Sequence, residues 1–598
     1  MTRRRPLAAR AAAALRGAAA LVLSGAAGSF AAALFVLGAA SSSAAAQAMP
    51  SPVAFADPAA WRAAPADGVA LRLVAGAPGE ICLDFDFRGR GGYAAARRPL
   101  PLDLPANYAF SFTLRGAGPS NTLEFKLVDP SGDDVWWVRR EEVVPGAPRR
   151  MVFKKRHVQF AWGPSRAPLT KLGAVEFAVT AGTGGKGRLC VGDFAFEARP
   201  EERPYAGVPK VSASSELPGF EASRLVAAPV AAREAAAPVA APEAAAPVVA
   251  PEAAAPVVAR EAAAPVAATP AAAWRAGADD AAPWVAFDFG EPREFGGLTV
   301  AWEDGRAPLD FDVDLSADGT NWTTAREARG FRGGLFLAAL PESEARFLRL
   351  RTLRGGAGCG IARLAVEPLE FAPTPSAFFA RVAAAARRGD YPRAYLGEQN
   401  YWTVVSVDGG LEKGLFDEDG RVEPAKGSFS LEPFVVAGGR VFSWADVQST
   451  PRLEDGSLPL PATTWLGDGF TLDVAAAAVG AADSSALVVR YRLANTSSER
   501  RALRLALAAR PHQVNPPAQF LGKPGGVAPI GSARWDGRAL LLDGAPRVLP
   551  LAPPTRVFAL TFDEGNVPAA LRDDAANEGT PPAASARRGG ARAANVGE

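Results

Sequence analysis

The sequence holds few of the residues on which many catalytic centres depend. Among 598 residues there are two histidines, three cysteines and three methionines. With only His157 and His512 available, a three-histidine metal site is excluded, and a Ser-His-Asp or Cys-His centre is not expected. Three cysteines cannot build a disulfide framework or a four-cysteine zinc site. We therefore expect no metal site and no cofactor. The sequence does not decide whether a structural calcium ion is bound.

Glycine and proline are abundant instead, with 60 and 52 copies. This usage argues against a mostly helical protein and favours β-domains joined by turns and linkers. Several segments alternate apolar and polar residues with the period of a half-buried strand. They are residues 71–73, 83–87, 110–114, 123–127, 311–315 and 347–350. The pattern predicts an all-β chain of sandwiches, with one helix at 376–388.

Basic residues are concentrated at the start of the chain. Residues 1–48 contain five arginines and no acidic residue, which leaves 60 Lys and Arg against 63 Asp and Glu in the remainder. A remainder with a net charge of −3 offers no general field for polyanions. Nucleic acid is therefore not expected as a partner.

The N-terminus has the organisation of an export signal. The arginines are followed by an uncharged run over 17–56, in which Ala46-Gln47-Ala48 provides a cleavage site of small residues. Residues 1–48 are therefore predicted to be a signal peptide. The alternative is an uncleaved membrane anchor, because the run is long enough to span a bilayer. Both alternatives predict export to the periplasm or the cell exterior. Attachment to the cell surface is compatible with either.

Two segments lack the residues that build a core. Residues 227–273 consist almost entirely of Ala, Pro, Val and Glu, and both glutamate and proline recur every nine residues. Proline at this density favours an extended spacer over a helix. Residues 563–598 contain no aromatic residue and little Leu, Ile or Val, so this tail is predicted to be disordered.

Three motifs after this Ala/Pro tract carry a family resemblance. They read Trp284-Val-Ala-Phe-Asp-Phe-Gly290, Gly297-Leu-Thr-Val-Ala-Trp302 and Ser316-Ala-Asp-Gly-Thr-Asn-Trp322. Residues 208–368 resemble the discoidin family, also called the coagulation factor 5/8 type C domain. The usual opening of that domain has its counterpart at 211–224. The resemblance therefore implies that 227–273 is an insertion inside one galactose-binding-like jelly roll.

Residues 50–200 resemble a second galactose-binding-like jelly roll, similar to some carbohydrate-binding modules. The segments that carry this resemblance are 83–93, 123–129, 135–137 and 160–164. Cys82 and Cys190 lie in the first and last core strands of this region. Export permits a disulfide between them, and two buried thiols are the alternative. Cys359 would stay unpaired.

The same region provides the candidate binding residues. In an alternating strand, only one of Trp136 and Trp137 can face the core. The other is expected on the polar face, near Lys126 and Arg139, where a ring and polar groups can hold a sugar. Alternatively, the outward tryptophan is covered by a loop or by another domain. The predicted carbohydrate-binding residues are Lys126, Trp136, Trp137 and Arg139.

Residues 376–562 resemble the β-supersandwich that precedes a helical (α/α)6 toroid in some glycoside hydrolases and phosphorylases. In that layout the acid and base carboxylates lie in the toroid, for which this chain has no room after Phe562. Four carboxylates of the region are interpreted as turn and strand-edge charges. They are Glu398, Glu418, Asp419 and Asp446. This larger β-sandwich is thus predicted to be incomplete, with a helical catalytic domain on a separate chain as an expected partner.

Together these patterns predict an exported carbohydrate-binding, discoidin domain-containing protein whose partner is a polysaccharide or glycan. The resemblance relates it to polysaccharide-acting glycoside hydrolases, but without their catalytic toroid, so no enzyme activity is expected of this chain. Two alternatives stay open. One is a glycoside hydrolase component, and the other is a surface adhesion protein that binds protein or lipid.

Overall fold

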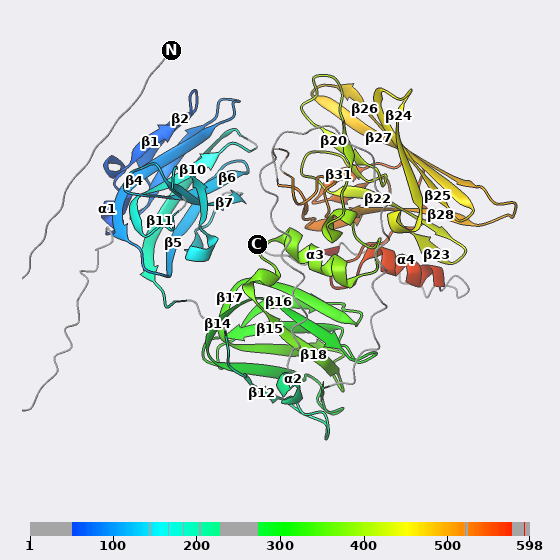
Figure 1. The fold of residues 1–598 in the computed structure, drawn as a ribbon, viewed down its shortest axis with the longest axis horizontal. Helices are drawn as coiled ribbons and strands as arrows, with labels where there is room; N and C mark the ends of the chain where they lie inside the picture. Colours follow the sequence, from blue (N-terminus) through cyan, green and yellow to red (C-terminus); the bar gives the residue numbers. More distant parts are fainter. Residues whose placement is uncertain are drawn as a thin grey trace, which may run out of the picture. The chain divides into compact units, whose positions relative to one another are not determined.

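The computed structural model describes residues 51–576 and 591–592, apart from gaps at 143–144, 166, 183, 202–204, 228–272, 520 and 522–523. The predicted signal peptide and nearly all of the Ala/Pro tract therefore lie outside the described residues. The chain divides into two compact units, Met1–Glu201 and Glu202–Glu598 (Figure 1). Both are built almost entirely of antiparallel sheets, which confirms the predicted all-β class.

The first unit contains two sheets. The six-stranded sheet has the order β1 (Arg62–Pro65), β4 (Tyr93–Asp103), β10 (Lys171–Thr180), β6 (Asn121–Val128), β7 (Val135–Glu142) and β9 (Gln159–Trp162). The five-stranded sheet has the order β2 (Ala70–Ala75), β3 (Ile81–Asp86), β11 (Lys186–Ala198), β5 (Tyr108–Ala117) and β8 (Arg149–Lys154). A short helix, α1 (Pro52–Ala56), precedes them.

Aromatic side chains fill the space between these two sheets. The rings of Phe110 and Phe112, from the five-stranded sheet, contact Phe125 of the six-stranded sheet, with centroids 5.6 and 5.4 Å apart. All three side chains are buried. Because successive strand residues point to opposite sides, each buried ring is flanked by outward positions. The core thus fixes which residues each sheet presents on its outer face.

The second unit begins with a sheet that contains the discoidin-like motifs. Its order is β13 (Trp274–Arg275), β18 (Gly360–Glu367), β14 (Trp284–Trp302), β17 (Leu335–Arg354), β15 (Asp310–Ser316) and β16 (Thr323–Arg329). A seventh strand, β12 (Lys210–Ala213), pairs with β14 and opposes Val211 to Phe287. A strand before the Ala/Pro tract is therefore hydrogen-bonded to a strand after it. Helix α2 (Arg224–Ala227) ends where the tract begins.

The rest of the second unit is formed by three sheets. The first has the order β19 (Trp402–Val405), β20 (Gly414–Asp417), β21 (Val422–Glu423), β22 (Ser430–Ala437) and β23 (Arg440–Phe442), and β28 (Leu503–Arg510) also pairs with β22. The second has the order β24 (Gln448–Glu454), β25 (Leu458–Gly467), β26 (Phe470–Ala481) and β27 (Ser484–Asn495). The third has the order β31 (Ala545–Val548), β30 (Leu540–Leu542), β29 (Ser532–Trp535) and β32 (Ala591–Arg592).

Two longer helices lie in this part of the chain. The predicted helix is α3 (Pro375–Ala385), which begins after Thr374 because the Thr374 side chain accepts the backbone N–H of Ala377. The prediction of a disordered tail from 563 was wrong for its first part, where α4 (Val567–Ala576) is helical. Leu571 of α4 is buried against β22 and β23, so the sheet provides the apolar contacts that the tail lacks on its own. No helix in the described residues is long and apolar enough to cross a bilayer.

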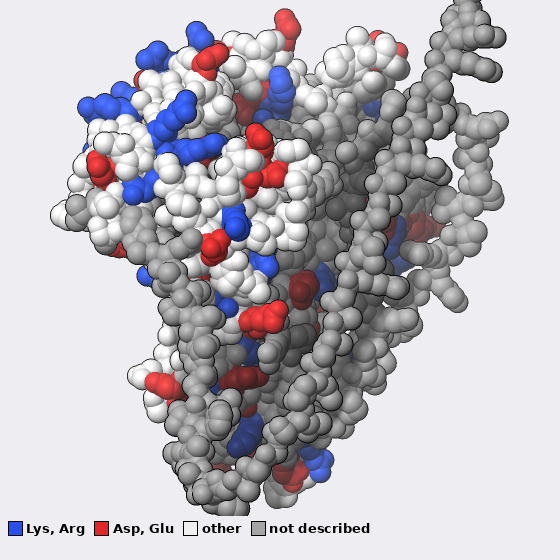
Figure 2. Space-filling model, turned by 60° about the vertical axis from the view of Figure 1, so that its left-hand side comes forward, with Lys and Arg blue, Asp and Glu red and all other residues white. Residues whose placement is uncertain are grey.

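Charges are mixed on the described part of the face that Figure 2 shows. In the view of Figure 2, Lys and Arg side chains are interspersed with Asp and Glu, and large uncharged areas separate them. The described part of this face therefore shows no extended region of a single charge sign.

Candidate functional site

The outer face of the six-stranded sheet carries polar and aromatic side chains on its central strands. Phe125 of β6 points into the core, so its neighbours Glu124 and Lys126 lie on the outer side. On β7, Trp136 is buried in the core and contacts Phe160, with ring centroids 5.6 Å apart. Its neighbour Trp137 therefore lies on the outer side, directly opposite Lys126 in the strand register.

Five charged side chains form a ladder across this face. Lys126 Nζ lies 3.1 Å from a carboxylate oxygen of Glu124 and 2.8 Å from one of Glu176. Arg97 Nε donates to Glu176 at 2.9 Å, and Arg139 Nε lies 3.2 Å from Glu124. The order is therefore Arg97, Glu176, Lys126, Glu124 and Arg139, with the sign alternating at each step. Each carboxylate has two cationic partners, which offsets the cost of its burial.

Three aromatic rings surround the centre of the ladder. Lys126 Nζ lies 5.8 Å from the centroid of Tyr93 and 5.3 Å from that of Trp162, within the range of a cation–π contact. Trp162 meets Trp137 edge to face, with centroids 5.4 Å apart and planes at 89°. Tyr93 and Trp162 are each 45% exposed. These rings and the ladder are called the binding face below: Tyr93, Arg97, Glu124, Lys126, Trp137, Arg139, Trp162 and Glu176.

A β-bulge brings Trp162 onto the binding face. Phe160 and Trp162 are two residues apart, so an unbroken strand would point both to the same side. The pairing of β7 with β9 shifts between Trp136, which opposes Phe160, and Val135, which opposes Trp162. One extra residue of β9 is accommodated there, and Trp162 emerges on the outer side while Phe160 packs on the core.

The four predicted carbohydrate-binding residues lie in different environments in the structure. Trp137 and Arg139 lie on the binding face, with the Arg139 guanidinium 4.5 Å from the Trp137 ring centroid. Trp136 lies in the core, so its inclusion as a site residue was wrong. Lys126 is on the face but buried beneath the rings, where it can position them rather than touch a ligand.

Sequence reasoning missed Tyr93 and Trp162 as site residues. Tyr93 is the first residue of β4 and lies two strand rows from Lys126, a proximity that depends on the packing of β4 beside β10 and β6. Trp162 depends on the bulge. The Phe160-Ala-Trp162 spacing by itself would have placed the two rings together.

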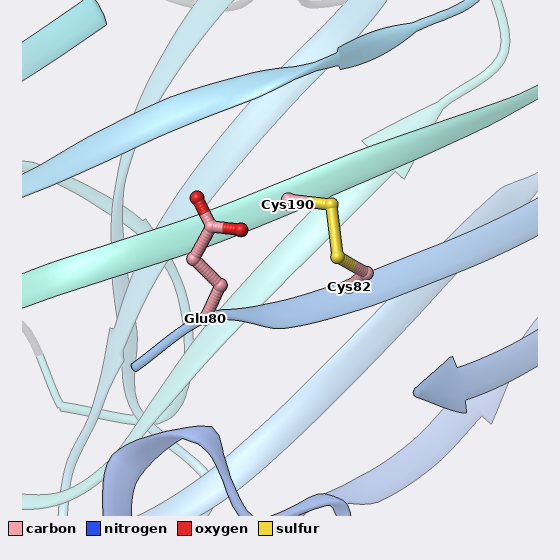
Figure 3. Close-up of side chains that lie close together, drawn as sticks. All are labelled: Glu80, Cys82 and Cys190. Atoms are coloured by element: carbon pink, nitrogen blue, oxygen red, sulfur yellow. A yellow bond between two sulfur atoms is a disulfide. The ribbon is translucent and has the colours of Figure 1, made fainter. Parts of the chain in front are cut away.

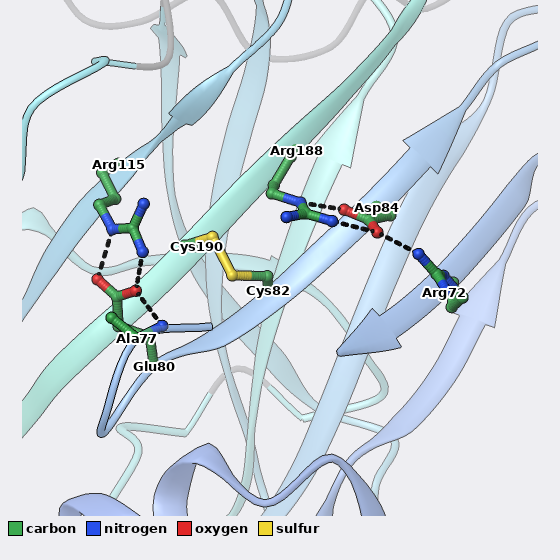
Figure 4. The surroundings of a disulfide bond; sticks show 8 residues. All are labelled: Arg72, Ala77, Glu80, Cys82, Asp84, Arg115, Arg188 and Cys190. Atoms are coloured by element: carbon green, nitrogen blue, oxygen red, sulfur yellow. Dashed lines mark hydrogen bonds and ion pairs between the residues drawn. A yellow bond between two sulfur atoms is a disulfide. The ribbon is translucent and has the colours of Figure 1, made fainter. Parts of the chain in front are cut away.

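The outer face of the five-stranded sheet carries a disulfide, a pairing that the sequence alone did not decide. Cys82 of β3 and Cys190 of β11 oppose each other in register and are covalently joined. Glu80 lies beside them (Figure 3), and these three groups have the ligand types of a metal site. The sulfurs are not thiolates in this state, however, and Glu80 is held by Arg115 and by the backbone N–H of Ala77 (Figure 4). Arg115 lowers the pKa of the Glu80 carboxyl group through its side-chain hydrogen bond.

A shallow hollow of about 580 Å³ is lined by residues of the same sheet, from β2, β3 and β11. Its wall includes Asp84, which receives a hydrogen bond from Arg188 at 2.8 Å and one from Arg72 at 3.1 Å. Figure 4 shows these partners on either side of Asp84. The Arg188 hydrogen bond is the main reason that the pKa of Asp84 is lowered.

The discoidin-like motif Ser316–Trp322 forms a tight turn. The Asp318 carboxylate accepts the backbone N–H groups of Thr320 and Asn321, each at 2.8 Å, and these bonds lower its pKa strongly. Gly319 adopts a φ of 77°, which favours glycine. Trp322 then donates its indole N–H to the Gly319 carbonyl at 3.1 Å. The residue types of this motif are therefore required by the turn itself.

Arginine–aspartate ion pairs connect β15, which leads into this turn, with its neighbour β17. Asp314 of β15 accepts hydrogen bonds from Arg349 at 2.8 Å and from Arg351 at 3.0 Å, both from β17. The Arg349 guanidinium lies 4.1 Å from the centroid of Trp322. Burial raises the pKa of Asp314, but the hydrogen bonds from Arg349, Thr324 and Arg351 outweigh it, so the pKa is lowered overall.

Two of the four carboxylates considered for catalysis lie at turns. Glu398 pairs with Arg388 at 2.9 Å. Asp446 closes a capping box with Ser443, in which each side chain accepts a backbone N–H of the other residue. Both residues therefore have structural partners.

The other two carboxylates, Glu418 and Asp419, share one arginine. Arg393 lies 3.2 Å from Glu418 and donates to both oxygens of Asp419, at 2.8 and 2.6 Å. Burial raises the pKa of Asp419 to about 7, and the neighbouring Asp417 carboxylate adds to this effect. This interior position matches a structural charge pair better than an acid and base across a substrate bond.

His512 lies outside the named strands and is buried. Its ring contacts three aromatic residues, Phe379, Tyr391 and Tyr395, with centroids 4.9, 5.7 and 5.1 Å away. Burial lowers its pKa well below 6.5, with a further contribution from Arg510. The imidazole is therefore neutral at pH 7 and belongs to the interior of the unit.

Comparison with known families identifies one domain. Residues 258–365 match the family model of the F5/8 type C domain, so this chain contains a discoidin domain. The matched range includes the motifs at 284–290, 297–302 and 316–322, which confirms that resemblance. No curated protein matches the sequence.

Solved structures of carbohydrate-binding modules are among the similar folds. One is the family 11 module of the cellulase Lic26A-Cel5E of Clostridium thermocellum, at 13% identity and a TM-score of 0.20, over 24% of this chain and 89% of that one. Another is chitosan-binding module 2 of a Paenibacillus sp. IK-5 chitosanase/glucanase with chitotriose, at 18% identity and a TM-score of 0.18, over 27% and 99%. A putative α-L-fucosidase from Bacteroides thetaiotaomicron matches at 17% identity and a TM-score of 0.18, over 27% of each chain.

Proposed function

We propose that this chain is an exported carbohydrate-binding protein whose binding face holds a polysaccharide. The observation that carries the proposal is the pair of half-exposed rings, Tyr93 and Trp162, held on either side of the buried Lys126 ammonium. Rings that are exposed together on one face form an apolar patch that a ligand can cover. A sugar offers an apolar C–H face to a ring and hydroxyl groups to neighbouring donors, so it suits this mixture.

The separation of the rings bears on the length of the ligand. The two centroids lie 5.8 and 5.3 Å from Lys126 Nζ, so they can be at most 11.1 Å apart, the sum of these distances. Tyr93 belongs to β4 and Trp162 to β9, with three strands between them in the sheet order. A ligand that covers both rings therefore runs across the strands, over at most this distance between the two centroids.

Two further features support the other parts of the proposal. A disulfide between Cys82 and Cys190 persists in an oxidising compartment, which agrees with the export signal predicted at 1–48. The discoidin domain provides a second module for attachment to a surface or glycan. A helical catalytic domain on a separate chain is part of the same proposal, and co-purification of such a protein with the tagged chain from its native host would test it.

The proposal predicts which tryptophan and tyrosine substitutions weaken binding. In affinity electrophoresis of the full chain against soluble polysaccharides, Trp162→Ala and Tyr93→Ala are each expected to weaken binding about fivefold, since one stacked ring contributes on the order of 1 kcal/mol. Tyr401→Ala is the matched control, because Tyr401 is 65% exposed in the other unit. Equal binding by all three variants and the parent would show that the rings do not contact the glycan.

A further inference from the structure

The charged ladder exposes its two terminal cations and hides its anions. The Arg97 and Arg139 side chains at the two ends are 38% and 40% exposed. The interior members are nearly inaccessible, at 6% for Glu176, 7% for Lys126 and 6% for Glu124. A ligand on the binding face therefore meets two guanidinium groups and no accessible carboxylate of the ladder.

Both terminal arginines keep hydrogen-bonding capacity for a ligand. Arg97 contacts Glu176 through Nε, and Arg139 contacts Glu124 through Nε. Nε is the atom of each arginine closest to its carboxylate, and a guanidinium has five N–H donors, more than one such contact uses. Their planar arrangement fits the two oxygens of a carboxylate or sulfate group, and it forms stronger hydrogen bonds with such anions than with neutral hydroxyls.

The burial of the two carboxylates indicates which ligands the binding face disfavours. An amino sugar carries an ammonium group, which needs an acidic partner when it leaves water. The acidic members of the binding face, Glu124 and Glu176, are already paired with two cations each and are covered by the rings. A cationic glycan would instead approach Arg97 and Arg139 with the same sign of charge.

We infer that the binding face selects acidic polysaccharides, those that carry carboxylate or sulfate groups, over neutral and amino-sugar chains. This inference rests on the proposed function and specifies its ligand class. The anionic groups lie over Arg97 and Arg139, and the sugar rings lie over Tyr93 and Trp162. The chain without residues 1–48 has a net charge of −3, so the preference is local and not the result of a general basic field.

The test compares four probes on the full chain by isothermal titration calorimetry. Polygalacturonate supplies carboxylates, dextran sulfate supplies sulfates, a soluble mixed-linkage β-glucan is neutral, and a chitosan oligomer at pH 6 is cationic. Binding to at least one acidic probe is expected to be tenfold or more tighter than to the neutral and cationic probes. Whichever of the two acidic probes binds more tightly identifies the anionic group.

Arginine substitutions test whether the preference for acidic polysaccharides comes from the binding face. Arg97→Gln and Arg139→Gln are each expected to weaken the acidic probe about tenfold, as loss of one charge-assisted pair implies, and the neutral probe less than twofold. Arg72→Gln is the matched control, because Arg72 is an exposed arginine paired with a carboxylate on the opposite sheet. Its affinities are expected to match those of the parent, and the melting temperatures of all variants check their folding.

Different experimental outcomes would refute the proposed function and the proposed ligand class. If Trp162→Ala weakens binding but the neutral glucan binds as tightly as the acidic probes, the acidic preference is refuted and the proposed function stands. Equal losses in Arg72→Gln and the two face variants would also refute the preference, because binding would then reflect surface charge in general. If no probe binds, the proposed function fails and the ligand class fails with it.

Discussion

Replacing Lys126 by methionine tests whether the charged ladder stabilises the first unit. Methionine fills a similar volume but leaves Glu124 and Glu176 without the ammonium they share. The two carboxylate oxygens lie 3.1 and 2.8 Å from Lys126 Nζ, so they are at most 5.9 Å apart, the sum of these distances. Two like charges at that distance repel by about 3 kcal/mol at an effective dielectric constant of about 20.

That estimate agrees with what is known of buried ion pairs. Removal of one partner from such a pair commonly costs about 3–5 kcal/mol, because a buried charge is left uncompensated. Glu124 and Glu176 keep Arg139 and Arg97 as partners, which places the expected loss at the lower end. Lys126→Met is therefore expected to lower the unfolding free energy of the first unit by about 3 kcal/mol.

Hydrogen exchange measured by mass spectrometry suits a chain of several domains, because peptides from β6 and β10 report the first unit alone. The double variant Lys126→Met/Glu176→Gln removes one of the two repelling charges. It is expected to recover more than half of the loss, although it carries one more substitution. A loss below about 1 kcal/mol in the single variant, or a further loss in the double variant, would refute this account of the ladder.

Three other changes test separate parts of the molecule. Because the Cys82–Cys190 disulfide closes a loop with a sequence separation of 108, replacing both cysteines by alanine is expected to cost about 2–5 kcal/mol in denaturant unfolding of the first unit. His512→Phe is expected to flatten the pH dependence of stability in scanning calorimetry between pH 7 and 5. Burial keeps the folded-state pKa of His512 well below 6.5, so below that pH only the unfolded chain gains the proton, and the parent loses up to about 1.4 kcal/mol per pH unit. Asp563→Ala removes the buried partner of Arg326, and proteolysis is expected to release the C-terminal helix faster than in the parent; equal rates in the variant and the parent would count against that ion pair.

Local patterns in the sequence were sufficient for the fold class and for one domain. Period-two alternation at 123–127 and 311–315 predicted strands that are present as β6 and β15, because a half-buried strand requires that pattern. The Ser316–Trp322 motif identified the discoidin domain, since its Asp, Gly and Trp are each needed by one local turn. Alternation also predicted that only one of the adjacent tryptophans at 136 and 137 would face the core.

Contacts between distant segments decided the rest. Only the core packing shows that Trp136 is the inward residue, and only the bulge in β9 turns Trp162 outward beside Trp137. The disulfide likewise depends on β3 and β11 being neighbours, which two cysteines 108 residues apart do not reveal.

The start of the tail shows the same limit. Residues 563–576 have too few apolar residues to form a core, yet α4 is stable against β22 and β23, because the sheet supplies the apolar surface. The sequence by itself determined what each segment could become, since strand alternation and turn chemistry act over a few residues. The tertiary structure decided which side chains meet, because burial and charge pairing depend on residues far apart in the chain.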